Sequence, residues 1–99
     1  MDKVPDSMER RKFVLAAYNA GLGHVFDAIR LAEKYEKDPS IWSGNVESMI
    51  LNKSKPEFYK DSLAFYGYCR GSETAAYVKE IMDRYNHYRN ITPTSEVEL

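Results

Sequence analysis

Residues 15–28 read LAAYNAGLGHVFDA, and this stretch decides how the chain folds. A helical run of apolar residues stops at Gly21, and a second helical run begins shortly after Gly23. Glycine adopts the left-handed backbone conformation that ends a helix at little steric cost. A short connection of this kind makes the two helices neighbours in space. The stretch therefore predicts two adjacent helices joined by a tight turn.

The helical periodicity extends to four segments, and no segment of convincing length alternates with a period of two. The sequence therefore predicts an all-α fold of about four helices. The first helix should open at Asp6, which has capping-box character with Glu9 three positions later. Its apolar face is predicted to hold Phe13, Val14, Ala17 and Tyr18. The second helix is predicted over residues 24–36, with an inward face of Val25, Ala28, Ile29 and Ala32.

The second half of the chain contains two further predicted helices and a long loop. Asn45 is a plausible N-cap for a short helix, and Ser72 for a last helix over residues 73–89. Between them, residues 56–72 hold two glycines and five aromatics, which predicts an ordered, partly buried loop. One side of the last helix should carry Tyr77, Val78, Ile81, Met82, Tyr85 and Tyr88. We expect residues 1–91 to form one domain and residues 92–99 a disordered tail.

Composition excludes several classes of function. Fourteen basic and fifteen acidic residues give a net charge of −1, which disfavours nucleic acid and anionic membrane as partners. No apolar run approaches the roughly 20 residues of a membrane-spanning helix, and no signal peptide is visible. A single cysteine and two distant histidines form neither an internal disulfide nor a metal site. The sequence predicts no cofactor.

Individual chemical motifs are weak when taken alone. Asp27, Glu47 and Glu73 lie near aromatic or amide residues, but spacing does not reveal which carboxyl group is perturbed. Cys69 has no histidine partner at a diagnostic spacing for nucleophilic catalysis. The aromatic residues on the last helix suit a core or a ligand platform. Tyrosines of the loop such as Tyr66 and Tyr68 suit a cleft that binds sugars, since they offer an apolar ring face and a polar tip.

One combination of motifs is specific. Residues 17–21 read AYNAG, and residues 73–78 read ETAAYV. In this order and spacing they resemble the second half of the catalytic domain of lytic murein transglycosylases, a lysozyme-like family. The intervening GH, DA and YGYCRG segments resemble the membrane-bound F type of that family. The resemblance covers roughly residues 13–88 and implies the C-terminal part of a lysozyme-like domain.

The resemblance also implies a chemistry that this chain lacks. The family uses a glutamate, found in a Glu-Ser pair followed by a Gly-Leu-Met-Gln-type motif, upstream of AYNAG. Only seventeen residues precede Tyr18, and neither motif is among them. Glu47-Ser48 follows AYNAG instead and is better interpreted as the start of a surface helix. We therefore expect no catalytic residue in this chain and no activity from it alone. The family cleaves the bond between N-acetylmuramic acid and N-acetylglucosamine and leaves 1,6-anhydromuramyl ends.

Four residues are predicted to bind substrate by resemblance. Tyr18 would orient the missing glutamate, and Asn19 would contact the saccharide. Glu73 and Tyr77 would line the same groove from the last helix. Each has a structural alternative, since Asn19 could cap the turn, the tyrosines could pack, and Glu73 could favour a helix N-terminus. His24 is more simply a local hydrogen-bonding residue than a metal ligand.

The resemblance implies a glycan strand of peptidoglycan as partner, and a periplasmic or cell-envelope location for the parent protein. The segment itself should not contact a membrane. A rival interpretation is a non-catalytic helical interaction module, whose aromatic loop over residues 58–68 binds a protein or another copy of the chain. Loss of packing partners could also expose apolar surface and cause self-association.

Overall fold

The computed structural model describes residue 4 and residues 6–91, and this part of the chain contains helices and turns but no strand. The predicted all-α fold is confirmed. The helices are α1 (Ser7–Ala20), α2 (Leu22–Lys34), α3 (Glu47–Asn52), α4 (Pro56–Tyr59) and α5 (Gly71–Ile91). A kinked segment, η1 (Trp42–Val46), leads directly into α3. The tail predicted over residues 92–99 lies outside the described residues.

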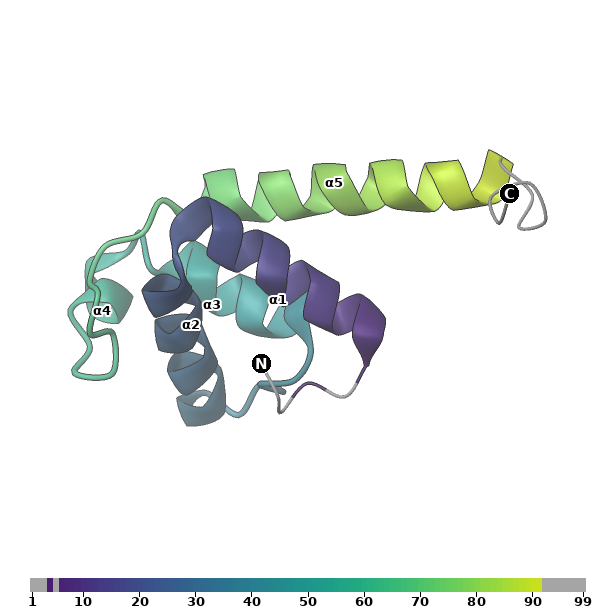
Figure 1. The fold of residues 1–99 in the computed structure, drawn as a ribbon. Coiled ribbons are helices and arrows are strands. Elements are labelled where there is room, and N and C mark those ends of the chain that lie inside the picture. The colour runs from purple at the N-terminus through teal and green to yellow at the C-terminus, as the bar shows by residue number, and fades with distance from the viewer. Residues whose placement is uncertain (1–3, 5, 92–99) are drawn as a thin grey trace.

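The helices α1, α2 and α3 gather into a small bundle, and α5 lies along α1 (Figure 1). The second half of α5 extends past the bundle, while α4 and the loop around it lie at the opposite end. The four predicted helices correspond to α1, α2, α3 and α5, and α4 is a single turn within the predicted aromatic loop. No helix in the described part is both long enough and apolar enough to span a membrane.

The start of α1 is capped as predicted and is also tied to η1. The Asp6 carboxylate accepts hydrogen bonds from the amides of Met8 (2.8 Å) and Glu9 (3.1 Å). Glu9 does not close a capping box: its carboxylate accepts from the backbone N–H of Trp42 at 2.7 Å and pairs with Lys12 at 2.8 Å. The residue expected to stabilise only its own helix therefore holds a distant segment against it.

Gly21 alone separates α1 from α2. Its φ of 103° and ψ of 143° lie in a region that L-residues with side chains rarely adopt. Its N–H closes α1 by bonding the carbonyl of Ala17 at 2.9 Å. Gly23 serves a different purpose, since a Cβ at that position would lie 2.5 Å from the ring of Tyr66. The first glycine makes the turn, and the second leaves room for the aromatic loop.

The core side of α1 differs from the predicted face. Phe13 and Ala16 are fully buried, and the Phe13 ring meets Trp42 edge to face at 5.8 Å. Val14 and Tyr18, which were assigned to the apolar face, are 56% and 82% exposed. That assignment was wrong for these two residues because residues 14 and 18 share one side of the helix, and α1 packs with the neighbouring side. The buried hydrophobic residues are Val4, Phe13, Ala16, Val25, Ala28, Leu31, Ala32, Trp42, Val46, Met49, Ile50, Ala64, Cys69, Val78 and Met82.

The predicted face of α5 is mostly confirmed. Val78 and Met82 are buried, while Tyr77 and Tyr85 pack against the core and remain partly exposed. Tyr88 is 70% exposed, because it lies on the half of α5 that extends past the other helices. At the other end, Gly71 begins α5 directly against α3, where a Cβ would come within 1.9 Å of the carbonyl oxygen of Ile50. The contact is with backbone, so the neighbour has little freedom to move.

We predict that Gly71→Ala destabilises the protein by about 1–3 kcal/mol, because the added methyl group forces α5 away from α3. Urea unfolding followed by circular dichroism measures the change. The matched control is Ser72→Ala. Ser72 is exposed and, contrary to the prediction, lies within α5 rather than at its N-cap, so the change in the free energy of unfolding should be less than about 0.5 kcal/mol. Equal stability of the two variants would show that the close approach of α5 and α3 is not a feature of the folded protein.

Candidate functional site

A polar hollow of about 170 Å³ lies where the end of α1, the start of α2, the end of the aromatic loop and the start of α5 meet. Two segments that are far apart in the sequence, residues 19–24 and residues 68–74, therefore contribute to one site. The residues that line it are Asn19, Ala20, His24, Tyr68, Cys69, Arg70, Glu73 and Thr74.

Two of the four predicted substrate residues line this hollow together. Asn19 comes from α1 and Glu73 from α5, and the two helices are joined here by a hydrogen bond of 2.8 Å from the Thr74 hydroxyl to Asn19 Oδ1. Tyr18 is 82% exposed and does not line the hollow. Tyr77 packs against the core and does not line it either. The hollow thus unites the predicted amide and carboxylate but neither predicted tyrosine.

Asn19 is oriented by its bond to Thr74. Because Oδ1 accepts the hydroxyl proton, the side-chain amide is fixed with its NH₂ group as the remaining polar end. Thr74 itself is buried, so the hydrogen bond is shielded from water. The side chain of Asn19 therefore links α1 to α5, and its NH₂ group is a donor that a ligand can use.

The wall of the hollow rests on the buried carboxylate of Asp27, one of the three carboxyl groups between which the sequence could not choose. Asp27 is fully buried on α2, and its Oδ2 atom lies 2.5 Å from the ammonium group of Lys53, which is also fully buried. Asp27 also pairs with Arg30. The backbone amides of Phe65 and Tyr66 donate to the same carboxylate at 3.0 and 2.8 Å. One side chain thereby neutralises a buried lysine and anchors the aromatic loop.

The loop has further supports that explain why it is ordered. Arg30 donates to the carbonyl of Leu63 at 3.0 Å, and its guanidinium group lies 4.1 Å from the centre of the Phe65 ring. The Tyr59 and Tyr68 rings meet edge to face at 5.7 Å. The prediction of an ordered, partly buried loop is confirmed, although Phe65 itself is 69% exposed.

His24 belongs to the same network, as a local hydrogen-bonding residue. Its Nδ1 atom lies 2.7 Å from the ammonium group of Lys53. Burial, together with the positive charge of Lys53, lowers the pKa of His24 below its ordinary 6.5, and the negative charge of Asp27 opposes the shift. No cluster of metal-ligating side chains occurs around it or elsewhere among the described residues.

The hollow also contains an ion pair and a thiol. Glu73 and Arg70 lie 4.0 Å apart and are largely exposed, so their attraction is weak. Burial raises the pKa of the Cys69 thiol, which therefore remains protonated at neutral pH and is a poor nucleophile. Outside the hollow, Glu47 begins α3 as predicted and accepts a hydrogen bond from the Gly44 amide.

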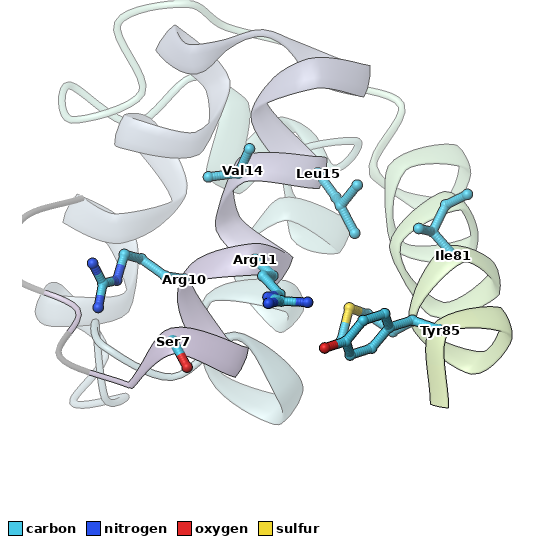
Figure 2. Close-up of a pocket in the computed structure, with 8 residues that line it drawn as sticks. Ser7, Arg10, Arg11, Val14, Leu15, Ile81 and Tyr85 are labelled. Carbon is cyan, nitrogen blue, oxygen red and sulfur yellow. The ribbon is translucent and has the colours of Figure 1, made fainter. Parts of the chain in front are cut away.

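A second, more apolar groove separates α1 from α5 and has a volume of about 480 Å³. Leu15 and Arg11 extend from α1 toward α5, and Ile81 and Tyr85 extend back toward α1 (Figure 2). The guanidinium group of Arg11 lies 4.6 Å from the centre of the Tyr85 ring. None of the four predicted substrate residues lines this groove.

Proteins similar to this chain are lytic murein transglycosylases. More narrowly, they are named membrane-bound lytic murein transglycosylase F. The protein from Shewanella frigidimarina is 42% identical over 89 residues, which is 87% of this chain and 18% of the relative. Those from Klebsiella pneumoniae and Desulfosudis oleivorans are 44% identical over 84 residues and 38% over 85, covering 82% and 86% of this chain. No family model matches the chain.

These matches confirm the resemblance first indicated by residues 17–21 and 73–78: the chain is related to a segment of lytic murein transglycosylase F. It spans less than a fifth of the length of these relatives, 18% and 16% in the Shewanella and Klebsiella proteins.

We predict strong coupling between Asp27 and Lys53. Asp27→Asn and Lys53→Met should each destabilise the protein by about 3–5 kcal/mol, since each leaves a buried charge without its partner. The double variant should lose less stability than the sum of the two single losses, and the difference should be about 0.5–3 kcal/mol. Urea unfolding of the four proteins measures the coupling.

The control for this double-mutant comparison is the exposed ion pair between Lys79 and Asp83 on α5. Lys79→Met and Asp83→Asn should show no measurable coupling, because water screens both charges. If the loss of stability in the double variant equalled the sum of the losses in Asp27→Asn and Lys53→Met, the two groups would not form a buried pair.

We predict that His24 makes stability fall as the pH drops from 7 to 5. Its folded-state pKa lies below 6.5, so the unfolded chain binds a proton more readily in this range and unfolding is favoured. Thermal unfolding at half-unit pH steps measures the slope, and His24→Gln should flatten it. His87 is present in both proteins, so the difference isolates His24. A slope that is unchanged in the variant would contradict the assignment.

Proposed function

We propose that this chain is the C-terminal part of the catalytic domain of a peptidoglycan lytic transglycosylase, and that the polar hollow binds a sugar of the glycan strand. One observation carries the proposal. Asn19 and Glu73 lie in the two motifs that resemble the family, and both line a single hollow beside an aromatic loop. Convergent polar groups next to aromatic side chains are typical of saccharide sites.

The residues of the hollow have distinct parts in binding. The NH₂ group of Asn19, held by Thr74, donates to a sugar oxygen. The carboxylate of Glu73 accepts from sugar hydroxyl groups. Tyr68 is 57% exposed at the edge of the hollow and offers a ring face to the apolar side of a pyranose. A volume of about 170 Å³ suits part of one sugar rather than a strand, so neighbouring sugars would extend outside it.

The reaction implied by the family requires an acid from another segment of the parent protein. A glutamic acid there protonates the oxygen between N-acetylmuramic acid and N-acetylglucosamine, and the bond to the muramyl anomeric carbon breaks. The resulting glutamate then removes the proton of the muramyl C6 hydroxyl, whose oxygen attacks that carbon and forms the 1,6-anhydro ring. Water is not consumed, and no second carboxylate is required.

Within this chain, Tyr18 remains the residue proposed to orient that acid. Its 82% exposure on the outer side of α1 leaves its hydroxyl free for a group outside the described part of the chain. Tyr77 is proposed to support the groove from within, since it packs against the core. We propose the periplasm or cell envelope as the location of the parent protein, because that is where its substrate lies.

A second candidate is a non-catalytic interaction module. The observation that favours it is the groove between α1 and α5, where Leu15, Ile81 and Tyr85 leave apolar surface uncovered (Figure 2). Another copy of the chain would bury this surface, which would appear as self-association.

We predict that a chitotetraose titration, followed by amide NMR, shifts the signals of Asn19 and Glu73. Asn19→Ala should weaken binding by about tenfold, because it removes a donor and the bond that orders Thr74. Asn86→Ala, on the exposed part of α5, is the matched control and should bind as the wild type does. Absence of shifts at Tyr18, Asn19 and Glu73 would favour the interaction module.

The same preparation should leave purified peptidoglycan intact. Mass spectrometry of the muropeptides should detect no new 1,6-anhydromuramyl ends after incubation with the chain. Their appearance would contradict the inference that the acid is supplied by another segment.

A further inference from the structure

The imidazole of His24 is part of the hollow, and one of its two ring nitrogens is already engaged. Nδ1 lies 2.7 Å from the Lys53 ammonium group, which is fully buried and paired with Asp27. Nε2 makes no hydrogen bond to any residue in the part of the chain that the structure describes. Nδ1 therefore contacts Lys53, and Nε2 is available to form a hydrogen bond with a ligand.

The contact with Lys53 determines where the proton of the ring resides. An ammonium group has three N–H donors and no lone pair, so it only donates. The ammonium group of Lys53 forms an ion pair with the carboxylate of Asp27 at 2.5 Å. Nδ1 must then be the acceptor, and a neutral imidazole that accepts at Nδ1 carries its hydrogen at Nε2.

Burial, assisted by the charge of Lys53, keeps the ring neutral. Lys53 faces it from the end of α3, and Asp27 from its own helix. The ring of Tyr66 lies 6.1 Å away, centre to centre, and Cys69, Arg70 and Glu73 line the same hollow. Burial and the Lys53 charge lower the pKa of His24 despite the opposing Asp27, so the neutral ring predominates at pH 7.

We propose that His24 is a sugar-binding residue whose Nε2–H donates a hydrogen bond to an N-acetylated sugar in the hollow, and that Lys53 is the positioning residue that fixes this tautomer. The acceptor is a hydroxyl oxygen or the acetamido carbonyl oxygen of the sugar. Together with the NH₂ group of Asn19, the hollow then presents two fixed donors, and Glu73 supplies the acceptor. This proposal rests on the proposed function and names how the sugar is recognised.

Lys53 acts through His24 and has no direct contact with the sugar. It is fully buried, and its ammonium group bridges Asp27 and Nδ1. The same Asp27 accepts from the amides of Phe65 and Tyr66, so the position of the ring and the position of the aromatic loop are set by one group. The hollow is thus prepared before a ligand arrives, which reduces the ordering cost of binding.

The first measurement uses the wild-type chain without sugar. Long-range ¹H–¹⁵N correlation of the His24 ring at pH 7.5 should show the Nε2–H tautomer. In Lys53→Met the same spectrum should show the two tautomers in exchange, because the donor that selects Nε2–H has been removed. An Nδ1–H tautomer in the wild type would overturn the proposal, whether or not sugars bind.

The second measurement compares two amide substitutions in a chitotetraose titration. In His24→Gln the terminal NH₂ group reaches the place of Nε2, so binding should stay within about twofold of the wild type. In His24→Asn the shorter amide reaches only the place of Nδ1, and the affinity should fall by about three- to tenfold, the loss of one hydrogen bond. Equal binding by the two variants would overturn the sugar contact.

The two measurements separate this proposal from the function on which it rests. If the wild type shows the Nε2–H tautomer but binds no sugar, the proposed function fails and the sugar contact of His24 fails with it. If sugar shifts the signals of Asn19 but leaves the Nε2 resonance of His24 unchanged, the proposed function stands and this inference is overturned.

Discussion

The buried carboxylate of Asp27 is the constraint on which the rest of the structure depends. Two cations and two backbone amides converge on it, from α2, from the end of α3 and from the aromatic loop. Burial of an isolated charge is very costly, so none of these partners can leave without a large penalty. A loop with little regular structure is thereby tied to α2 by two backbone hydrogen bonds. The hollow exists because this loop stays in place.

Much of the fold could be predicted from the sequence because its signals are local. Helical periodicity located the main helices, Asp6 marked the start of α1, and Gly21 marked the turn. The order of the two motifs indicated the family, and the matches to the F-type relatives confirm it. Of the site, Asn19 and Glu73 were predicted and lie together, whereas their part in binding sugar remains a proposal.

The remainder depends on contacts between distant residues, which periodicity does not encode. Lys53 follows a short helix in a run of polar residues and looks like a surface lysine, yet it is fully buried. Only its partner, 26 positions earlier, explains this. Likewise, Val14 and Tyr18 have the spacing of a core face but are exposed, because the partners of α1 lie on its neighbouring side. The spacing of hydrophobic residues shows that a segment is helical more reliably than it shows which side of the helix packs against the core.

The junction at Gly21 has a consequence for how the hollow could change during evolution. Asn19 and His24 lie on either side of this single residue, one in α1 and the other in α2. The separation of their backbones is therefore set by a few consecutive residues, while Thr74 of α5 and Lys53 orient their side chains. An insertion or deletion at the turn would rotate one helix against the other and part the two side chains, whereas changes in the other walls would leave them together. The turn thus fixes the spacing of the two backbone positions, while the other residues that line the hollow are free to diverge.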